Sequence, residues 1–439
     1  MKYKNIILIF FTLLYSNAQL DSLSVLINNR DYYQAIDFAD DVFKKGIDAG
    51  DKFFKKASES ALELDDLDKS MKYLKKARTI NDNDNYREEW DRIVKMKKDI
   101  EIALKKYTDE NKIEESIDEL MRLKKTSYLD CALIDYSIGK IYQEEEDYSK
   151  AFEWFESAVS LNPYRSKYKD SLNYIIGQFI IDGDEYYSMR DFTSAIENYL
   201  FADQNLSVIV DKTESEQEIL LKLKFKIAKT YYFLKNYNDA LSVLKSLVVS
   251  DPENYEAYKL LGDVYKKESS LELALESYLQ AININDKYEK AYLASGQIYF
   301  SQGDISNALN YLNTAVELKS DYAKAYETIG VIYQRKEDYL KAIFNYEQTI
   351  QYDRRNYKAM ARLASVYNSA KQYASAKKWA KECNKVKRSY PDGYYELGIA
   401  EKGLGNRIAA IKAFEKAKKS SKWRKIAEYE IDQIKKELD

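Results

Sequence analysis

A 34-residue register constrains this chain more than any other feature of its sequence. When position 1 is set at Tyr255, a small residue at position 8 and an apolar residue at position 24 recur at the same offsets through six consecutive units. Position 8 is glycine in four of these units: Gly262, Gly296, Gly330 and Gly398. A repeat of this length is one supersecondary unit, which buries its apolar face only by stacking on its neighbours.

Within each unit, the apolar positions predict two amphipathic helices. Positions 4, 7, 8 and 11 recur at three- and four-residue steps, and positions 20, 24 and 27 do the same farther along. This spacing places each set on one face of a helix, so that the two faces pack together. A glycine inside a helix costs about 0.5–1 kcal/mol relative to alanine. The glycines at position 8 therefore indicate a close crossing of the two helices.

The order of these residues resembles the tetratricopeptide repeat, in which W-x₂-L-G-x₂-Y is followed by A-x₃-F, A and P. The unit that starts at Tyr255 supplies Leu261, Gly262, Tyr265, Ala274, Tyr278 and Ala281 in that order. Tyrosine usually replaces the first aromatic residue, and the closing proline remains only at Pro163 and Pro252. The resemblance covers about 420 residues. It implies an all-α solenoid of about eleven helix-turn-helix repeats, in which each repeat contacts only its neighbours.

An export signal is predicted over residues 1–18. Lys2 and Lys4 precede a ten-residue apolar core, and a small-residue cleavage site ends at Ala18, so that the mature chain would begin at Gln19. The core is shorter than the roughly 20 apolar residues of a membrane-spanning helix, and no other apolar run approaches that length. We therefore expect no integral membrane segment after signal cleavage, and a location in the periplasm, at the cell surface or outside the cell.

Three further segments follow the signal. Residues 19–220 hold degenerate repeats with insertions, because three intervals between unit starts exceed 34 residues by about ten to twelve. Such an excess is about three helical turns, which favours either longer helices or ordered loops. Residues 221–422 hold the six regular units. Residues 423–439 are predicted to form an amphipathic helix that caps the exposed face of the last unit.

The absence of histidine excludes much catalytic and metal chemistry. No His-dependent acid–base pair, nucleophile or zinc site can be formed from this composition. Cys131 and Cys383 lie several repeats apart, so we expect both thiols to be free, and no cysteine cluster could hold a metal ion. The sequence therefore predicts a binding protein rather than an enzyme, without catalytic residues, cofactor or metal site.

The resemblance also implies that the first helix of each repeat lines a concave groove that binds extended peptides or partner helices. In relatives, positions 2, 5, 9 and 12 of that helix face the groove, and position 2 is lysine in four of the regular units here. A cationic, partly aromatic groove favours an acidic peptide, although an ordinary solvated helix edge gives the same pattern. The candidate groove residues are Lys222, Phe225, Lys229, Tyr232, Lys259, Lys266, Lys290, Gln297, Phe300, Lys324, Gln334, Lys358, Arg362 and Asn368.

Charge is divided unevenly along the chain. Residues 371–425 include 16 basic and 5 acidic residues, a net charge of +11, whereas the whole chain carries −3. Removal of the signal leaves −5, and the last 14 residues carry −3, so the 352 mature residues before the basic segment carry −13. Such asymmetry favours an anionic partner, although solvated helix faces produce it too. The candidate residues of this basic end are Lys412, Lys416 and Lys419, which helical spacing places near one face.

Two functions remain open from the sequence. The first is an interaction scaffold of the bacterial cell envelope, which binds protein partners through the groove, the basic end or both. The second is an accessory protein that binds an anionic or carbohydrate surface polymer, with exposed tyrosines stacking on sugar rings. An export signal argues against nucleic acid as a partner. Lipopolysaccharide, other surface polymers and acidic proteins are the candidate polyanions.

Overall fold

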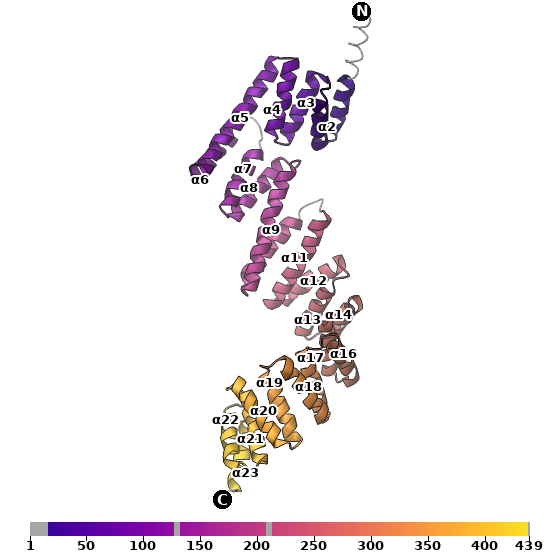
Figure 1. The fold of residues 1–439 in the computed structure, drawn as a ribbon, viewed down its shortest axis with the longest axis vertical. Helices are drawn as coiled ribbons and strands as arrows, with labels where there is room; N and C mark the ends of the chain where they lie inside the picture. Colours follow the sequence, from indigo (N-terminus) through magenta and orange to yellow (C-terminus); the bar gives the residue numbers. More distant parts are fainter. Residues whose placement is uncertain (1–15, 127–131, 208–212, 438–439) are drawn as a thin grey trace, which may run out of the picture. The chain divides into compact units, whose positions relative to one another are not determined.

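A computed structural model of the chain describes residues 16–126, 132–207 and 213–437. Of these described residues, 82 % are helical and none lies in a strand. They form eleven successive helix pairs and one closing helix (Figure 1), which confirms the all-α solenoid expected from the register. The chain divides into two compact units, unit 1 (Met1–Glu216) and unit 2 (Gln217–Asp439).

Unit 1 contains five helix pairs, the first of which consists of residues 16–28 and α2 (Tyr32–Lys44). The others are α3 (Gly50–Glu63) with α4 (Leu67–Ile80), α5 (Asp84–Thr108) with α6 (Ile113–Thr126), α7 (Ala132–Glu144) with α8 (Tyr148–Leu161), and α9 (Ser166–Ser188) with α10 (Phe192–Ser207). The sequence predicted either longer helices or ordered loops for the extra residues of the N-terminal half. α5 has 25 residues and α9 has 23, so longer helices take up much of the excess.

Unit 2 contains six helix pairs, of which the first begins just before the unit boundary. They are α11 (Glu214–Phe233) with α12 (Tyr237–Ser250), α13 (Tyr255–Lys267) with α14 (Leu271–Ile284), α15 (Glu289–Ser301) with α16 (Ile305–Leu318), α17 (Ala323–Arg335) with α18 (Tyr339–Tyr352), α19 (Tyr357–Ser369) with α20 (Tyr373–Val386), and α21 (Pro391–Gly403) with α22 (Arg407–Ala417). The closing helix α23 (Arg424–Lys436) buries Ala427, Ile431 and Ile434 against the last pair.

The turns between the two helices of each described pair share a left-handed residue. This residue, at position 15, has a positive φ in every pair, from Arg30 (59°) to Gly405 (78°). In ten of these eleven turns the following amide donates to the carbonyl five residues earlier, as Asp338 N does to Tyr333 O at 3.0 Å. This is the Schellman arrangement, which ends a helix with a left-handed residue. In the α5–α6 turn, Lys112 N instead donates to Lys106 O, six residues earlier, at 2.8 Å. Glycine takes this position only at Gly303 and Gly405, so nine of the turns use a residue with a side chain.

Glycine at position 8 lies where the two helices of a pair cross. A Cβ atom added at Gly262 would stand 2.5 Å from the ring of Tyr278, and one added at Gly330 would stand 2.8 Å from the ring of Tyr346. The same contact recurs between Gly139 and Phe155, Gly183 and Tyr199, Gly296 and Leu312, and Gly398 and Phe414. The close crossing predicted from these glycines is therefore present in both units.

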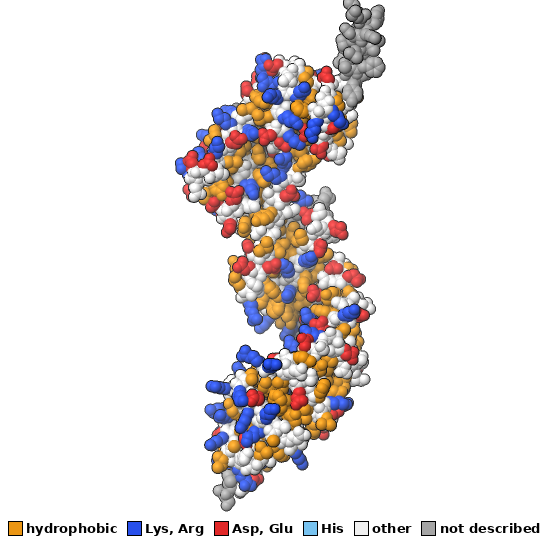
Figure 2. Space-filling view, in the orientation of Figure 1, with side chains coloured by type: hydrophobic (Ala, Val, Ile, Leu, Met, Phe, Trp, Pro, Cys, Tyr) orange, Lys and Arg blue, Asp and Glu red, His pale blue; other side chains and the backbone are white. Residues whose placement is uncertain are grey.

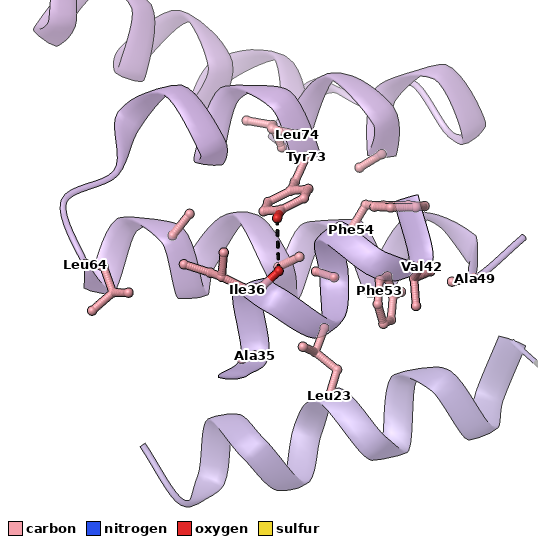
Figure 3. Packing of buried hydrophobic residues seen from close by; sticks show 14 of the residues in the cluster. Leu23, Ala35, Ile36, Val42, Ala49, Phe53, Phe54, Leu64, Tyr73 and Leu74 are labelled. Atoms are coloured by element: carbon pink, nitrogen blue, oxygen red, sulfur yellow. Dashed lines mark hydrogen bonds between the residues drawn. The ribbon is translucent and has the colours of Figure 1, made fainter. Parts of the chain in front are cut away.

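Aromatic rings fill the core of the first two helix pairs (Figure 3). Phe53 and Phe54 of α3 are fully buried and meet edge-to-face, with ring centroids 5.3 Å apart. Tyr73 of α4 is also fully buried, and its hydroxyl donates to the carbonyl of Ile36 at 3.2 Å. Leu23 packs against the same cluster and so attaches the first helix of the chain to this core.

The predicted export signal falls mostly outside the described residues. Residues 1–15 are not described, and residues 16–18 belong to the helix that ends at residue 28. Cleavage before Gln19 would leave Leu23, the fully buried residue of that helix, in the mature chain. Among the helices of the described ranges, none is both long and apolar enough to cross a membrane.

Unit 1 departs from the expectation that each repeat contacts only its neighbours. The turn between α8 and α9 reaches past the third helix pair to the first two. Asn162 donates its side-chain amide to the carbonyl of Glu63 at 2.7 Å and to the carboxylate of Asp65 at 2.8 Å. Arg30 donates to the hydroxyl of Tyr164 at 2.7 Å. The nearest-neighbour expectation is therefore wrong for this unit.

The length of α5 explains these contacts between distant repeats. The first half of α5 packs on the second helix pair, where Lys55 of α3 pairs with Glu89 at 2.7 Å and Ile93 is fully buried. Its second half continues beyond that pair and carries α6, whose Ser116 donates to the carbonyl of Ala103 at 2.8 Å. The α5–α6 hairpin therefore extends away from α3 and α4 (Figure 1) and leaves the α3–α4 turn open to the α8–α9 turn.

Candidate functional site

Four of the candidate groove lysines, together with Gln297, lie in one cavity of unit 2. Lys259 of α13, Lys290 of α15 and Lys324 of α17 line a hollow of about 570 Å³. Because these helices are the first members of three successive pairs, equivalent faces of three repeats form one wall. The other lining residues are Asp263, Lys266, Leu293, Ala294, Gln297, Lys319, Asp321, Tyr322, Ala323 and Asp353.

Asp263 connects this cavity to the helix crossing behind it. Its carboxylate accepts a hydrogen bond from the hydroxyl of Tyr278 at 2.9 Å and pairs with the ammonium of Lys259 at 2.5 Å. Tyr278 is fully buried against Gly262. Burial, and then the charge of Asp263, raise the pKa of Tyr278, so its hydroxyl remains a donor. Tyr278, which packs against Gly262 where the two helices cross, therefore also holds the Asp263 carboxylate in position at the groove.

Lys266 bridges two repeats at the same cavity. Its ammonium donates to the side-chain oxygen of Gln297 in the next pair at 3.1 Å. Desolvation by the surrounding protein lowers the pKa of Lys266, and the charge of Asp263 partly opposes this effect. An anionic group bound beside Lys266 would favour its charged form. The position is therefore suited to a carboxylate ligand.

Positive charge exceeds negative charge in the cavity wall. Five lysines and three aspartates line it, a net charge of +2. Within the described part of the chain, Lys259 is the only one of the five lysines that forms an ion pair. The ammonium groups of Lys290 and Lys319 lie 5.8 Å and 5.3 Å from the ring centroids of Tyr288 and Tyr322. The cavity thus combines uncompensated cations with aromatic rings.

The remaining candidate groove residues lie outside this cavity. On α11, Lys222 and Lys229 are exposed, and Phe225 and Tyr232 are half-buried. Phe300 of α15 is half-buried, with the guanidinium of Arg335 at 4.7 Å from its ring centroid. Lys358 and Arg362 are exposed on α19.

Two polar residues expected to face the groove are instead engaged with neighbouring side chains. Asn368 is buried and donates to the Glu396 carboxyl group at 2.8 Å. Gln334 accepts a hydrogen bond from the hydroxyl of Tyr346 at 2.7 Å. The expectation that Asn368 faces the groove is wrong, because α21 packs over this side of α19. Repeat position alone does not distinguish a groove residue from one covered by the next repeat.

Sequence reasoning missed the part of the wall that comes from the turns between repeats. Lys319, Asp321 and Tyr322 precede α17, and Asp353 follows α18. The prediction considered only the first helix of each repeat, so these residues were not candidates. Their aromatic and charged character at positions 31 to 34 was the available signal.

The structure separates the three candidate lysines of the basic end. Lys412 and Lys416 are exposed on α22, and the ammonium of Lys416 lies 4.9 Å from the ring centroid of Tyr394. Lys419 is exposed too, but α22 ends at Ala417. The helical spacing assumed for all three therefore holds only for the first two, and Lys419 belongs to the following turn.

Much of the basic segment lacks a compensating charge. Of the 16 basic residues over 371–425, six form ion pairs: Lys377, Lys385, Lys402, Arg407, Lys418 and Lys422. The other ten form none among the described residues. Two acidic residues of the segment, Glu396 and Glu401, are buried. Lysine and arginine side chains accordingly gather over the part of unit 2 that holds α19 to α22 (Figure 2).

Thiols and acidic groups in the described ranges provide no metal site. Cys383 is free and fully buried, and burial raises its pKa to about 12, so it is a poor nucleophile and metal ligand. Cys131 lies outside the described residues. No group of three His, Cys, Asp or Glu side chains within those ranges could hold a metal ion.

Family models match four parts of the chain. Two tetratricopeptide repeat models match residues 225–292 and 136–165, and a TPR repeat model matches residues 296–337. The model of the TT21 fifth ARM repeats domain matches residues 324–435. The chain is a tetratricopeptide repeat (TPR) protein. TPR repeats in general form non-catalytic scaffolds for protein–protein interaction.

Several solved structures are similar to this TPR chain. YrrB, described as a TPR protein with an unusual peptide-binding site, is 15 % identical and covers 42 % of this chain and 96 % of its own, with a TM-score of 0.39. A tetratricopeptide repeat protein from Parabacteroides merdae is 14 % identical over 59 % of this chain and 98 % of its own, with a TM-score of 0.43. The Cut9–Hcn1 structure from the APC/C is 13 % identical over 96 % and 98 %, with a TM-score of 0.41. No curated protein sequence matches the chain.

Proposed function

We propose that this TPR protein is a non-catalytic scaffold that binds an acidic segment of a partner protein in the cavity formed by α13, α15 and α17. The observation that carries the proposal is that one cavity brings together four lysines that form no ion pair with any residue the structure describes. These residues are Lys266, Lys290, Lys319 and Lys324.

The cavity suits an extended acidic peptide better than a neutral one. Carboxylates of the peptide would accept charge-assisted hydrogen bonds from lysines of successive repeats. Leu293 and Tyr322 offer apolar contact beside those lysines. The walls are packed helices, so little ordering of the scaffold is needed when the peptide binds. Charge complementarity of this kind chiefly sets the association rate and the choice of partner.

We further propose that the protein is exported to the periplasm or the cell surface. The n-region, apolar core and cleavage site over residues 1–18 support this location. N-terminal sequencing of the protein from the producing cell would then begin at Gln19. A chain that begins at Met1 and stays in the inner membrane would contradict the proposal.

Capture of partners from an envelope extract tests the groove. The immobilised full chain should retain a defined set of proteins at low salt and release it as salt rises, because exposed charges are screened over about 8 Å at physiological ionic strength. A double variant, Lys290→Glu with Lys324→Glu, should lose that set. Lys267→Glu is the matched control, because Lys267 is exposed on α13 outside the cavity. Equal capture by the double variant and the wild type would refute the groove.

An anionic surface polymer is the second candidate partner, and the uncompensated cations of the basic end favour it. Lys412 lines an open hollow of about 650 Å³ together with Lys377 and Arg407. Reversal of Lys412, Lys416 and Lys419 to glutamate should weaken binding of purified lipopolysaccharide at low salt, with helix content and melting unchanged. If the triple variant binds as tightly as the wild type, the basic end only serves solubility.

A further inference from the structure

Unit 1 contains a cavity of its own, away from every candidate groove residue. It measures about 500 Å³ and lies among α4, α5, α7 and the start of α9. Asp65, at one end of its wall, accepts hydrogen bonds from Asn162 at 2.8 Å and from the Tyr168 hydroxyl at 2.9 Å. The contacts between the α8–α9 turn and the second helix pair therefore lie at one end of this cavity.

The central part of the wall is apolar. Leu67 comes from α4, Ile100 and Leu104 from α5, and Leu133 and Ile141 from α7. They share one space because the second half of α5 extends beyond the second helix pair. The volume lies within the range of roughly 300–1,000 Å³ that small-molecule sites occupy in proteins.

Neighbouring groups already engage four of the five acidic residues in the wall. Asp65 binds the α8–α9 turn, and Asp66 caps α4 by accepting from the Lys69 amide at 3.0 Å. Asp68 and Glu101 both pair with Lys97. The fifth, Glu144, is exposed at the end of α7. Asp66, Asp68 and Glu101 are thus compensated by Arg165 and Lys97, whereas the hydrogen bonds to Asp65 come from neutral groups and leave its charge in place.

Two cations of the wall have no such partner. Lys140 of α7 donates to Gln143 at 3.0 Å, and the ammonium of Lys167 lies 4.4 Å from the ring centroid of Tyr136. Neither lysine forms an ion pair within the described ranges. Tyr136 and Lys140 lie one helical turn apart on α7. A cationic and aromatic corner therefore adjoins the apolar part of the wall.

We propose that this cavity binds a small amphipathic anion, with an aliphatic or aromatic body and a single carboxylate. The body fills the space among Leu67, Ile100 and Leu104, where its transfer from water is favourable by about 0.8 kcal/mol per buried CH₂ group. The carboxylate accepts charge-assisted hydrogen bonds from Lys140 and Lys167. The site lies wholly in unit 1, so it does not depend on the groove of unit 2.

Calorimetric titration of the full chain with octanoate tests this site. Octanoate should bind with a stoichiometry of one. Octanol should bind at least about tenfold more weakly, and octylammonium should not bind, because the corner is cationic. In a series of linear carboxylates, affinity should rise with chain length and then level off once the cavity is full. A steady rise without a plateau would indicate adsorption to apolar surface and would overturn the proposal.

Variants locate the binding. Lys140→Ala combined with Lys167→Ala should weaken octanoate binding about tenfold, and Leu104→Trp should abolish it by filling the cavity. Lys98→Ala is the matched control, because Lys98 belongs to α5 but not to the wall. Circular dichroism reports whether the Leu104→Trp variant folds. If that variant does not fold, the octanoate affinity of the lysine double variant alone tests the proposal. Binding that survives the lysine double variant, or that the groove variant Lys290→Glu with Lys324→Glu abolishes, would contradict the assignment.

Discussion

Unit 2 repeats its helix pairs at a constant interval, whereas unit 1 interrupts that interval with α5 and α9, which are 25 and 23 residues long. In both units, a glycine at position 8 of one helix packs against the side chain at position 24 of the other, and the residue at position 15 has a positive φ. The units differ in what the repeats contact. In unit 2 the pairs stack in order, and in unit 1 the α8–α9 turn binds the first two pairs. The length of one helix thus decides whether a repeat contacts only its neighbours.

The two candidate sites follow from this difference. The groove of unit 2 uses equivalent positions of successive repeats, such as Lys290 and Lys324, so its wall recurs with the register. The cavity of unit 1 is lined by positions that are not equivalent, from the Asp65 turn to Lys167. A regular stack therefore yields an extended polar groove, and the interrupted unit yields a single, more apolar cavity.

The largest expected effect tests the crossing that both units share. Gly330→Leu places a side chain where even a Cβ atom would stand 2.8 Å from the ring of Tyr346. Overpacking should lower the free energy of unfolding by about 3 kcal/mol in urea titrations.

Gly177 provides the control for that substitution. It lies inside α9, with nothing within 4 Å of an added Cβ atom. Gly177→Ala should therefore stabilise unit 1 by about 0.5–1 kcal/mol, because alanine favours the helix. If Gly330→Leu and wild type unfold at the same urea concentration, the crossing does not determine stability.

The next effect distinguishes how the units bury a carboxyl group. In unit 1, fully buried Asp135 pairs with Lys124 at 2.7 Å. In unit 2, desolvation raises the pKa of Glu396 from 4.5 to about 7, with Asp392 adding to the shift while hydrogen bonding to Asn368 and the charge of Lys422 oppose it.

A raised carboxyl pKa means that the folded state binds a proton that the unfolded state has released. The stability contributed by protonated Glu396 is therefore complete below about pH 4.5 and is lost as pH rises through about 7. Unit 2 should lose about 3 kcal/mol over this range, since one pKa unit corresponds to about 1.4 kcal/mol. Glu396→Gln should remove the loss in melting curves recorded across that window. An unchanged pH slope in this variant would assign the dependence to another group.

A smaller loss of stability is expected when the contact between the α8–α9 turn and the second helix pair is removed. Asn162→Ala removes the part-buried hydrogen bonds to Glu63 and Asp65 and should cost about 1–2 kcal/mol, because both bonds are lost together. The control is Asn285→Ala at the equivalent position of unit 2. Among the described residues, the side chain of Asn285 makes a single hydrogen bond, accepted from the Lys287 amide at 3.1 Å, so this change should cost less than about 1 kcal/mol. Equal costs in urea unfolding would remove the distinction between the units.

The smallest effect concerns the turn that the units have in common. Glu146 in unit 1 and Glu337 in unit 2 both have a φ of 58°. Glycine adopts this conformation without the steric cost of a side chain. Glu146→Gly and Glu337→Gly should therefore each stabilise the chain by about 0.5 kcal/mol, and by similar amounts. A gain in only one unit would show that the turns are not equivalent.

The fold was predictable because its signal recurs in the sequence. The contact between Gly262 and Tyr278 recurs at equivalent positions in six repeats. Lys290 and Lys324 likewise occupy the same position of two successive repeats. The left-handed turns were hidden, because residues such as Glu337 carry side chains that do not mark a positive φ.

The contact between the α8–α9 turn and the first two helix pairs could not be predicted from the repeat pattern. Arg30 and Tyr164 are 134 residues apart and occupy unrelated repeat positions, so no periodicity connects them. They meet only because α5 continues past the second helix pair, and the sequence left longer helices and ordered loops equally open. The α8–α9 turn lies at one end of the cavity of unit 1, which was missed for the same reason.

Contacts between distant repeats join the helix pairs of unit 1, whereas each pair of unit 2 contacts only its neighbours. Hydrogen exchange of the full chain in increasing denaturant tests this difference most directly. The account predicts that amides of α2 to α4 and of α7 and α8 lose protection together, in one opening event. In unit 2, protection should instead fall gradually toward α23, because terminal repeats of a stack open first. Exchange of α7 and α8 at low denaturant, with α2 to α4 still protected, would contradict the account.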